Sequence, residues 1–82
     1  MYYRIAPEPP KTTIKRGGAF SYWRSPYYDE GFKVALLAFI PRADRRWYKE
    51  RQVWAVRIQH TEQLADLVEQ FYLRRPETEE AQ

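Results

Sequence analysis

Apolar residues at helical spacing predict a helix in the last third of the chain. The stripe follows the i, i+3, i+4, i+7 pattern and comprises Leu64, Leu67, Val68 and Phe71. This pattern is typical of an amphipathic helix that buries one face. Thr61 suits the N-cap of this helix, with Glu62 in its first turn, and Pro76 ends it.

A second apolar stripe predicts an earlier helix that ends before Pro41. It comprises Phe32, Ala35, Leu36, Phe39 and Ile40. Two starts fit the sequence, since Ser25 is a good N-cap and Pro26 suits the first helical position. The other start lies at Asp29, because Gly31 weakens the first turn of a longer helix.

Four shorter segments alternate in the manner of strands, at residues 12–16, 19–24, 45–49 and 52–58. Gly17-Gly18 and the polar residues 49–51 fit the turns of two hairpins. In the second strand, Phe20 and Tyr22 share one face, and Ser21 and Trp23 share the other. In the fourth strand, the apolar alternation makes the face of Trp54 the expected core face.

The order of these elements predicts an α+β fold, β-β-α-β-β-α, with a small antiparallel sheet and two helices on one face. Residues 1–11 are expected to form an extended Pro-rich arm, 12–75 a single domain, and 76–82 an acidic disordered tail. The expected core comprises Phe20, Leu36, Phe39, Ile40, Trp54, Val56, Leu64, Leu67, Val68 and Phe71.

Charge divides the chain into a basic body and an acidic end. Residues 1–60 hold twelve Lys and Arg against five Asp and Glu, and residues 61–82 hold two against six. A basic body favours a polyanion as partner, although ordinary solubility charge gives the same pattern. Arg outnumbers Lys and Asn is absent, which suits a thermophile or a GC-rich genome.

The side chains needed for most chemistry are missing. The 82 residues include no Cys and one His, which excludes disulfides, Cys-based zinc sites and thiol catalysis. His60 stands directly before the expected helix cap and is expected to pack locally. No phosphate-binding Gly-rich loop and no secretory leader is visible. We therefore expect a cytoplasmic protein that is not an enzyme, with no cofactor, metal or membrane partner.

Cations and aromatic residues are interleaved in the predicted strands and turns. Arg and Lys supply most of the non-specific affinity for phosphates, and aromatic rings stack on unpaired bases. The candidate nucleic-acid contacts are Lys15, Arg16, Trp23, Arg24, Arg42, Arg45, Arg46, Trp47, Lys49, Arg51 and Arg57.

The sequence leaves open which face of the third strand binds a ligand. Trp47 lies on one face, and Arg46 and Tyr48 lie on the other. If Trp47 is exposed, it forms a stacking platform, and if it is buried, Arg46 and Tyr48 take that role. If the two hairpins lie side by side, their outer faces merge into one basic surface.

The series of motifs from residue 20 to residue 72 resembles the HepA-related protein (HARP) domain. An apolar helix ends at Ile40-Pro41, Arg45-Arg46-Trp47 begins a strand, and Val53-Trp54-Ala55-Val56 precedes the closing helix. Tyr22 to Tyr27 also fits the upstream part of the family pattern. The turn at residues 48–51 departs from it, since that family commonly has Asp-Pro or Asp-Gly-like residues there.

The resemblance implies a DNA-binding accessory module that favours forked or single-stranded DNA, similar to modules found beside helicases and in phage proteins. The leading hypothesis is therefore sequence-tolerant DNA binding. A protein-interaction module is the alternative, because Tyr, Trp and Arg also anchor protein interfaces. A small phage protein docking on a host enzyme, or a homodimer formed through a sheet edge, would be concrete versions.

Overall fold

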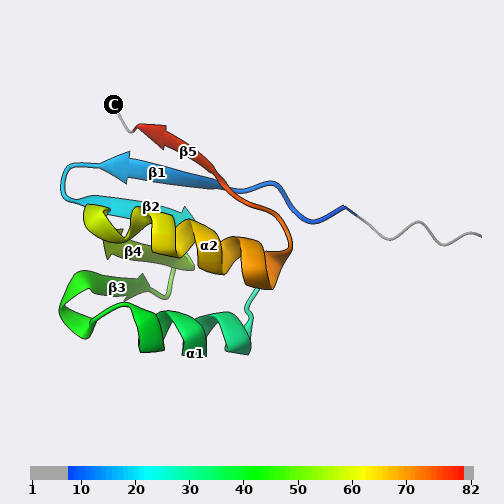
Figure 1. The fold of residues 1–82 in the computed structure, drawn as a ribbon, viewed down its shortest axis with the longest axis horizontal. Coiled ribbons are helices and arrows are strands. Elements are labelled where there is room, and N and C mark those ends of the chain that lie inside the picture. Colours follow the sequence, from blue (N-terminus) through cyan, green and yellow to red (C-terminus); the bar gives the residue numbers. More distant parts are fainter. Residues whose placement is uncertain (1–7, 81–82) are drawn as a thin grey trace, which may run out of the picture.

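The two hairpins expected from the sequence lie side by side in one sheet (Figure 1). The structure is a computed structural model that describes residues 8–80. Its elements in chain order are β1 (Thr13–Gly17), β2 (Phe20–Arg24), α1 (Glu30–Phe39), η1 (Arg42–Asp44), β3 (Arg45–Tyr48), β4 (Val53–Arg57), η2 (Ile58–His60), α2 (Thr61–Tyr72) and β5 (Glu77–Glu80). The α+β class and the β-β-α-β-β-α order are confirmed, and β5 is added to them.

The strands are ordered β3-β4-β2-β1-β5 across the sheet. Strands β2 and β4 pair antiparallel and join the two hairpins, with Trp23 opposite Trp54. Both helices lie on the same side of the sheet (Figure 1). Within residues 8–80 the other side carries no helix, and we call it the open face.

The core lies between the two helices and one side of the sheet. Trp23 is fully buried at its centre, and its ring centroid lies 5.0 Å from those of Phe32 and Tyr72. Burial raises the pKa of Tyr72 to about 12, so its hydroxyl stays a donor and bonds to the carbonyl of Tyr27 at 2.8 Å. The core cluster comprises Ile14, Trp23, Phe32, Leu36, Ile40, Trp54, Val56, Leu64, Ala65, Leu67, Val68 and Tyr72.

The expectation that Phe20 belongs to the core is wrong. Trp23 and Ser21 face the helices instead, and Phe20 lies half-buried on the open face. An indole offers more apolar area to bury than a phenyl ring. The polar Ser21 that accompanies Trp23 inward is satisfied, because its hydroxyl lies 2.6 Å from that of Thr61.

Helix α1 begins at the later of the two expected starts. Asp29 is its N-cap, and its carboxylate accepts a hydrogen bond from the backbone N–H of Phe32 at 2.9 Å. The Ser25 hydroxyl instead donates to the carbonyl of Tyr27. Gly31 serves close helix packing, since a Cβ there would stand 2.9 Å from a ring carbon of Phe71.

The end of α1 differs from the expected core. Phe39, expected to be buried, is 64% exposed. The chain leaves the helical conformation at Ile40, which precedes Pro41 and has extended dihedral angles. Ile40 is fully buried, so at this end of the helix Ile40 packs into the core and Phe39 does not. Phe71 is only partly buried and packs against the core cluster.

The segment after α2 forms a strand where a disordered tail was expected. Leu73 turns the chain in the left-handed conformation, and the buried Pro76 precedes β5. Strand β5 pairs parallel with β1, and ion pairs join Lys11 to Glu77 and Arg16 to Glu80. Residues 1–7 of the expected arm and 81–82 of the tail lie outside the described residues.

Candidate nucleic-acid interface

Aromatic and basic side chains alternate across the open face. The pairing register aligns Lys15 with Tyr22 and Tyr22 with Ala55, and it aligns Ala55 in turn with Arg46. Residues aligned in this way point to the same side of a sheet. The aromatic and basic side chains of the open face are Lys15, Phe20, Tyr22, Arg24, Arg46, Tyr48 and Arg57.

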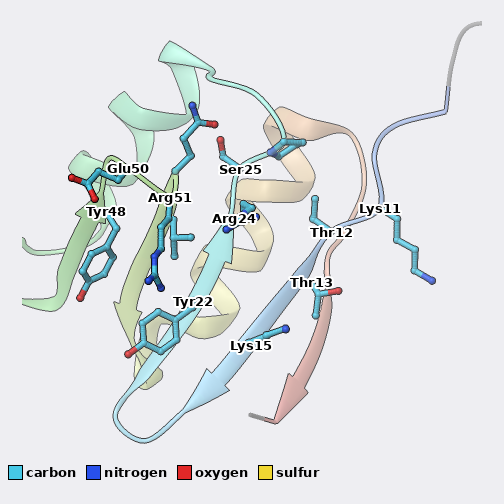
Figure 2. Close-up of a pocket in the computed structure, with 13 residues that line it drawn as sticks. Lys11, Thr12, Thr13, Lys15, Tyr22, Arg24, Ser25, Tyr48, Glu50 and Arg51 are labelled. Carbon is cyan, nitrogen blue, oxygen red and sulfur yellow. The ribbon is translucent and has the colours of Figure 1, made fainter. Parts of the chain in front are cut away.

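An open groove crosses this face between β3 and β1 (Figure 2). Tyr22 and Tyr48 both line it and are 37% and 42% exposed. Figure 2 shows Arg51 between the two tyrosine rings in this view. The cations that line the groove are Lys11, Lys15, Arg24 and Arg51, and Glu50 is its acidic member.

Most of these cations are not neutralised by a neighbour. Within residues 8–80, no carboxylate oxygen lies within 4.0 Å of the charged nitrogens of Lys15, Arg24, Arg46 or Arg51. Lys11 differs, since its ammonium lies 3.0 Å from Glu77. Such exposed, uncompensated cations are available to phosphates.

Two arginine side chains cover the ring of Phe20 on the open face. The guanidinium carbons of Arg46 and Arg57 lie 5.3 Å and 5.4 Å from its ring centroid, within range of cation–π attraction. Arg57 also lies 3.3 Å from Asp44, which contacts His60 at 2.9 Å. The bare tyrosines of the groove are therefore better placed to stack on a base than Phe20.

Four of the predicted contacts lie on the open face and a fifth lines its groove. The four on the face are Lys15, Arg24, Arg46 and Arg57, and Arg51 lines the groove. Arg42 lies in η1 and Lys49 in the β3–β4 turn, and both are exposed.

Four other predicted contacts face the helix side. Trp23 is in the core, so the prediction that it touches a ligand must be corrected. Arg16 pairs with Glu80 at 3.1 Å, and Arg45 donates to the carbonyl of Ile40. Trp47 lies opposite Trp54 with ring centroids 4.7 Å apart, and it keeps 39% of its surface exposed.

Four residues of the open face and its groove are not among the predicted contacts. Tyr48 is expected only as the alternative to Trp47. Because Trp47 lies opposite Trp54, which faces the helices, the two-residue period places Tyr48 on the open face. The expected core includes Phe20, and because Tyr22 shares the face of Phe20 in β2, that expectation pointed both rings away from the open face. Lys11 was assigned to the arm, and no sequence signal placed it beside the groove.

The helix side of the molecule carries acidic charge. Glu62, Asp66 and Glu69 lie along α2, and all three reach Arg75 at 2.7 Å, 2.7 Å and 3.2 Å. Hydrogen bonds to Asp66 and Glu69 raise the pKa of Arg75 further above its usual range. The open face is therefore the more attractive side for a polyanion.

Groups suited to metal binding or membrane insertion are not gathered in the described part of the chain. Residues 8–80 contain no cluster of three His, Cys, Asp or Glu side chains that could hold a metal ion. No helix in this range is long and apolar enough to cross a membrane. Comparisons with protein-family models, curated proteins and solved structures gave no match.

Proposed function

We propose that the protein is a non-catalytic, sequence-tolerant binder of single-stranded DNA that uses its open face. The observation that carries the proposal is the groove, where two exposed tyrosine rings lie among cations, most of which lack carboxylate partners in the described chain. Aromatic rings stack on unpaired bases of any sequence, and Arg and Lys contact the backbone phosphates. The proposal keeps the role, and the cytoplasmic location, expected from the sequence.

Single-stranded DNA fits this face better than duplex DNA does. Tyr22 and Tyr48 present exposed rings, and stacking needs bases that are not already paired. The open face of the sheet presents strands within residues 8–80 and offers no helix for insertion into a major groove. Forked DNA would bind through its unpaired arms. The basic open face and the acidic α2 side would orient the strand towards the sheet.

The experiment is a titration of fluorescently labelled single-stranded and duplex DNA at two salt concentrations. The protein should bind the single strand with a dissociation constant of roughly micromolar order at low salt, more tightly than the duplex. Affinity should fall as salt rises. Equal affinity for both DNA forms, or no binding at low salt, contradicts the proposal.

Matched variants distinguish a contribution of the open face to DNA affinity from an effect of the total charge. Arg24→Gln with Arg46→Gln should lower the salt slope by about 1.4, since each phosphate contact of a single strand contributes about 0.7. The control, Lys33→Gln with Arg74→Gln, removes the same charge outside the open face. Tyr22→Leu should weaken single-strand binding while it leaves the salt slope unchanged.

A further inference from the structure

The two outer edges of the sheet are both available for pairing. Strand order makes β3 and β5 the outermost strands, and within residues 8–80 neither has a second strand partner. Exposed strand edges are templates for pairing with another chain. Both strands are four residues long, and all of β5 and most of β3 are exposed.

The free backbone groups on each edge can be assigned from the hydrogen bonds of the inner strands. Bonds from Ser25 to Gln52 and from Ile58 to Ala19 fix the alternation of the β2–β4 ladder. Carried across β4, that alternation points the amides and carbonyls of Arg45 and Trp47 away from the sheet. The amide of Arg45 accordingly bonds back to Arg42 in η1.

At the β5 edge, the pairing with β1 determines which backbone groups point outward. The amide of Glu77 donates to the carbonyl of Thr12, so Glu77 faces β1. Its alternate neighbours, Thr78 and Glu80, therefore present their backbone groups outward. The β5 edge thus offers the amides and carbonyls of Thr78 and Glu80. The β3 edge offers those of Trp47 and the carbonyl of Arg45, whose amide is bonded to Arg42.

The two edges carry opposite charge. Arg45 and Arg46 lie in β3, with Lys49 directly after it. Glu77, Glu79 and Glu80 make up most of β5. Pairing of β3 with β3, or of β5 with β5, would therefore bring like charges together, which destabilises a strand pair. Charge permits β3 to pair with β5 and disfavours both symmetric pairs.

We propose that the β3 edge of one copy of this chain pairs antiparallel with the β5 edge of a second copy. One register matches the outward-facing residues of both edges, with Trp47 opposite Thr78 as a full hydrogen-bonded pair and Arg45 opposite Glu80 joined through the Arg45 carbonyl. Between them Arg46 faces Glu79 on the open side. All four residues of each strand then have a partner, and the Arg45 amide, which is bonded to Arg42, is the one backbone group of these pairs that donates nothing across the contact.

The pair of Arg46 and Glu79 contributes most of the charge complementarity. Neither side chain has an ion-pair partner within residues 8–80. Glu77 and Glu80, in contrast, already contact Lys11 and Arg16 at 3.0 Å and 3.1 Å. The second copy thus supplies a counter-ion that the chain itself does not.

The contact is heterologous, because each copy uses a different edge on its two sides. Repeating it builds a ring or a helical array rather than a dimer with one shared patch. Strand direction allows the sheet to continue, since β3 runs opposite to β5. Continuation of one sheet keeps the open faces of successive copies on the same side.

The first test is sedimentation of the DNA-free protein up to roughly 1 mM, because so small an interface associates weakly. Average mass should rise with concentration, and the rise should shrink in about 1 M salt. Arg46→Glu alone and Glu79→Arg alone should each weaken assembly roughly tenfold. An equimolar mixture of the two variants should restore it, because each acidic edge then meets a basic one.

The second test uses cysteine pairs, which the chain permits because it has no native Cys. Tyr48 and Glu77 of neighbouring copies would face each other at a pair without backbone hydrogen bonds, where Cα atoms lie about 4.5 Å apart. Tyr48→Cys with Glu77→Cys should give a ladder of disulfide-linked species on oxidation. Either single variant has one thiol and can form a dimer at most.

Three outcomes would overturn the proposal. The wild-type protein could stay monomeric up to the highest concentration, or the mixture of Arg46→Glu and Glu79→Arg could assemble no better than either variant alone. The double cysteine variant could also give no species beyond a dimer. Each readout is independent of DNA, so a failed DNA titration would leave these results unaffected.

Discussion

Leu73 shows how a single residue can carry strain at the end of a helix. Its φ is 63°, in the left-handed region, and its side chain is 75% exposed. L-residues with a Cβ pay roughly 1–2 kcal/mol in this conformation, which Gly adopts freely. The residue ends α2 by donating its N–H to the carbonyl of Glu69 at 3.0 Å, so the backbone geometry is needed and the side chain is not.

Leu73→Gly should therefore stabilise the protein by about 0.5–1 kcal/mol, after the entropic cost of Gly in the unfolded chain. Urea denaturation measures the change. Leu73→Ala is the matched control, because it removes the exposed side chain but keeps the Cβ. If both variants change the unfolding free energy equally, strain at this position is not the reason.

His60 is the residue that should make stability depend on pH near neutrality. Its hydrogen bonds to Asp44 and Gln63 raise its pKa above the ordinary 6.5. A pKa that is higher in the folded state stabilises the fold below pH 6.5, and this contribution is lost as pH rises through the folded value. The unfolding free energy should therefore decline over this window.

His60→Gln should flatten that decline above about pH 6.5, since the chain has no other histidine. Urea denaturation at several pH values measures it. A variant curve that runs parallel to the wild-type curve would show that another group causes the decline.

Residue patterns determine which side chains share a face more readily than which face is buried. The alternation in β2 correctly grouped Phe20 with Tyr22 and opposed them to Trp23. The choice between the two faces depends on the strand opposite, because the pairing of Trp23 with Trp54 brings both indoles under the helices. That long-range register is not visible in a local pattern.

At the scale of elements, the sequence predicted the helices and the first four strands with shifts of a few residues. The helical stripes and turn residues are strong local signals. Strand β5 has no such signal, since the Glu77–Glu80 segment is acidic and lacks apolar alternation. Its strand conformation comes from the edge of β1, which supplies hydrogen bonds and the cations Lys11 and Arg16.

At the scale of the whole molecule, the candidate surface is a product of sheet order. The sequence predicts contacts from the cations of both hairpins and one merged surface if the hairpins lie side by side. The β2–β4 pairing fulfils that condition and sorts the cations by side, leaving Arg24 and Arg46 on the open face and Arg16 and Arg45 on the other. The acidic β5 then lies along one border of this surface.

The acidic border should weaken DNA binding if the open face is the interface. Glu77 aligns with Thr13 and holds Lys11, a cation of the groove, at 3.0 Å. Glu77→Gln removes one negative charge from the border and frees Lys11 for a phosphate. Affinity for single-stranded DNA at low salt should rise about two- to fivefold, and the salt slope should steepen by about 0.7 for one added phosphate contact.

Glu62→Gln is the matched control, because it removes the same charge from α2, where Glu62 contacts Arg75 on the helix side. Its effect should be smaller, since charges beyond about 10 Å are largely screened at moderate salt. Equal gains in affinity from the two substitutions would mean that net charge governs binding. That result would contradict the proposal that the open face is the interface. A gain confined to Glu77→Gln, with the steeper slope, would place Lys11 in contact with the bound strand.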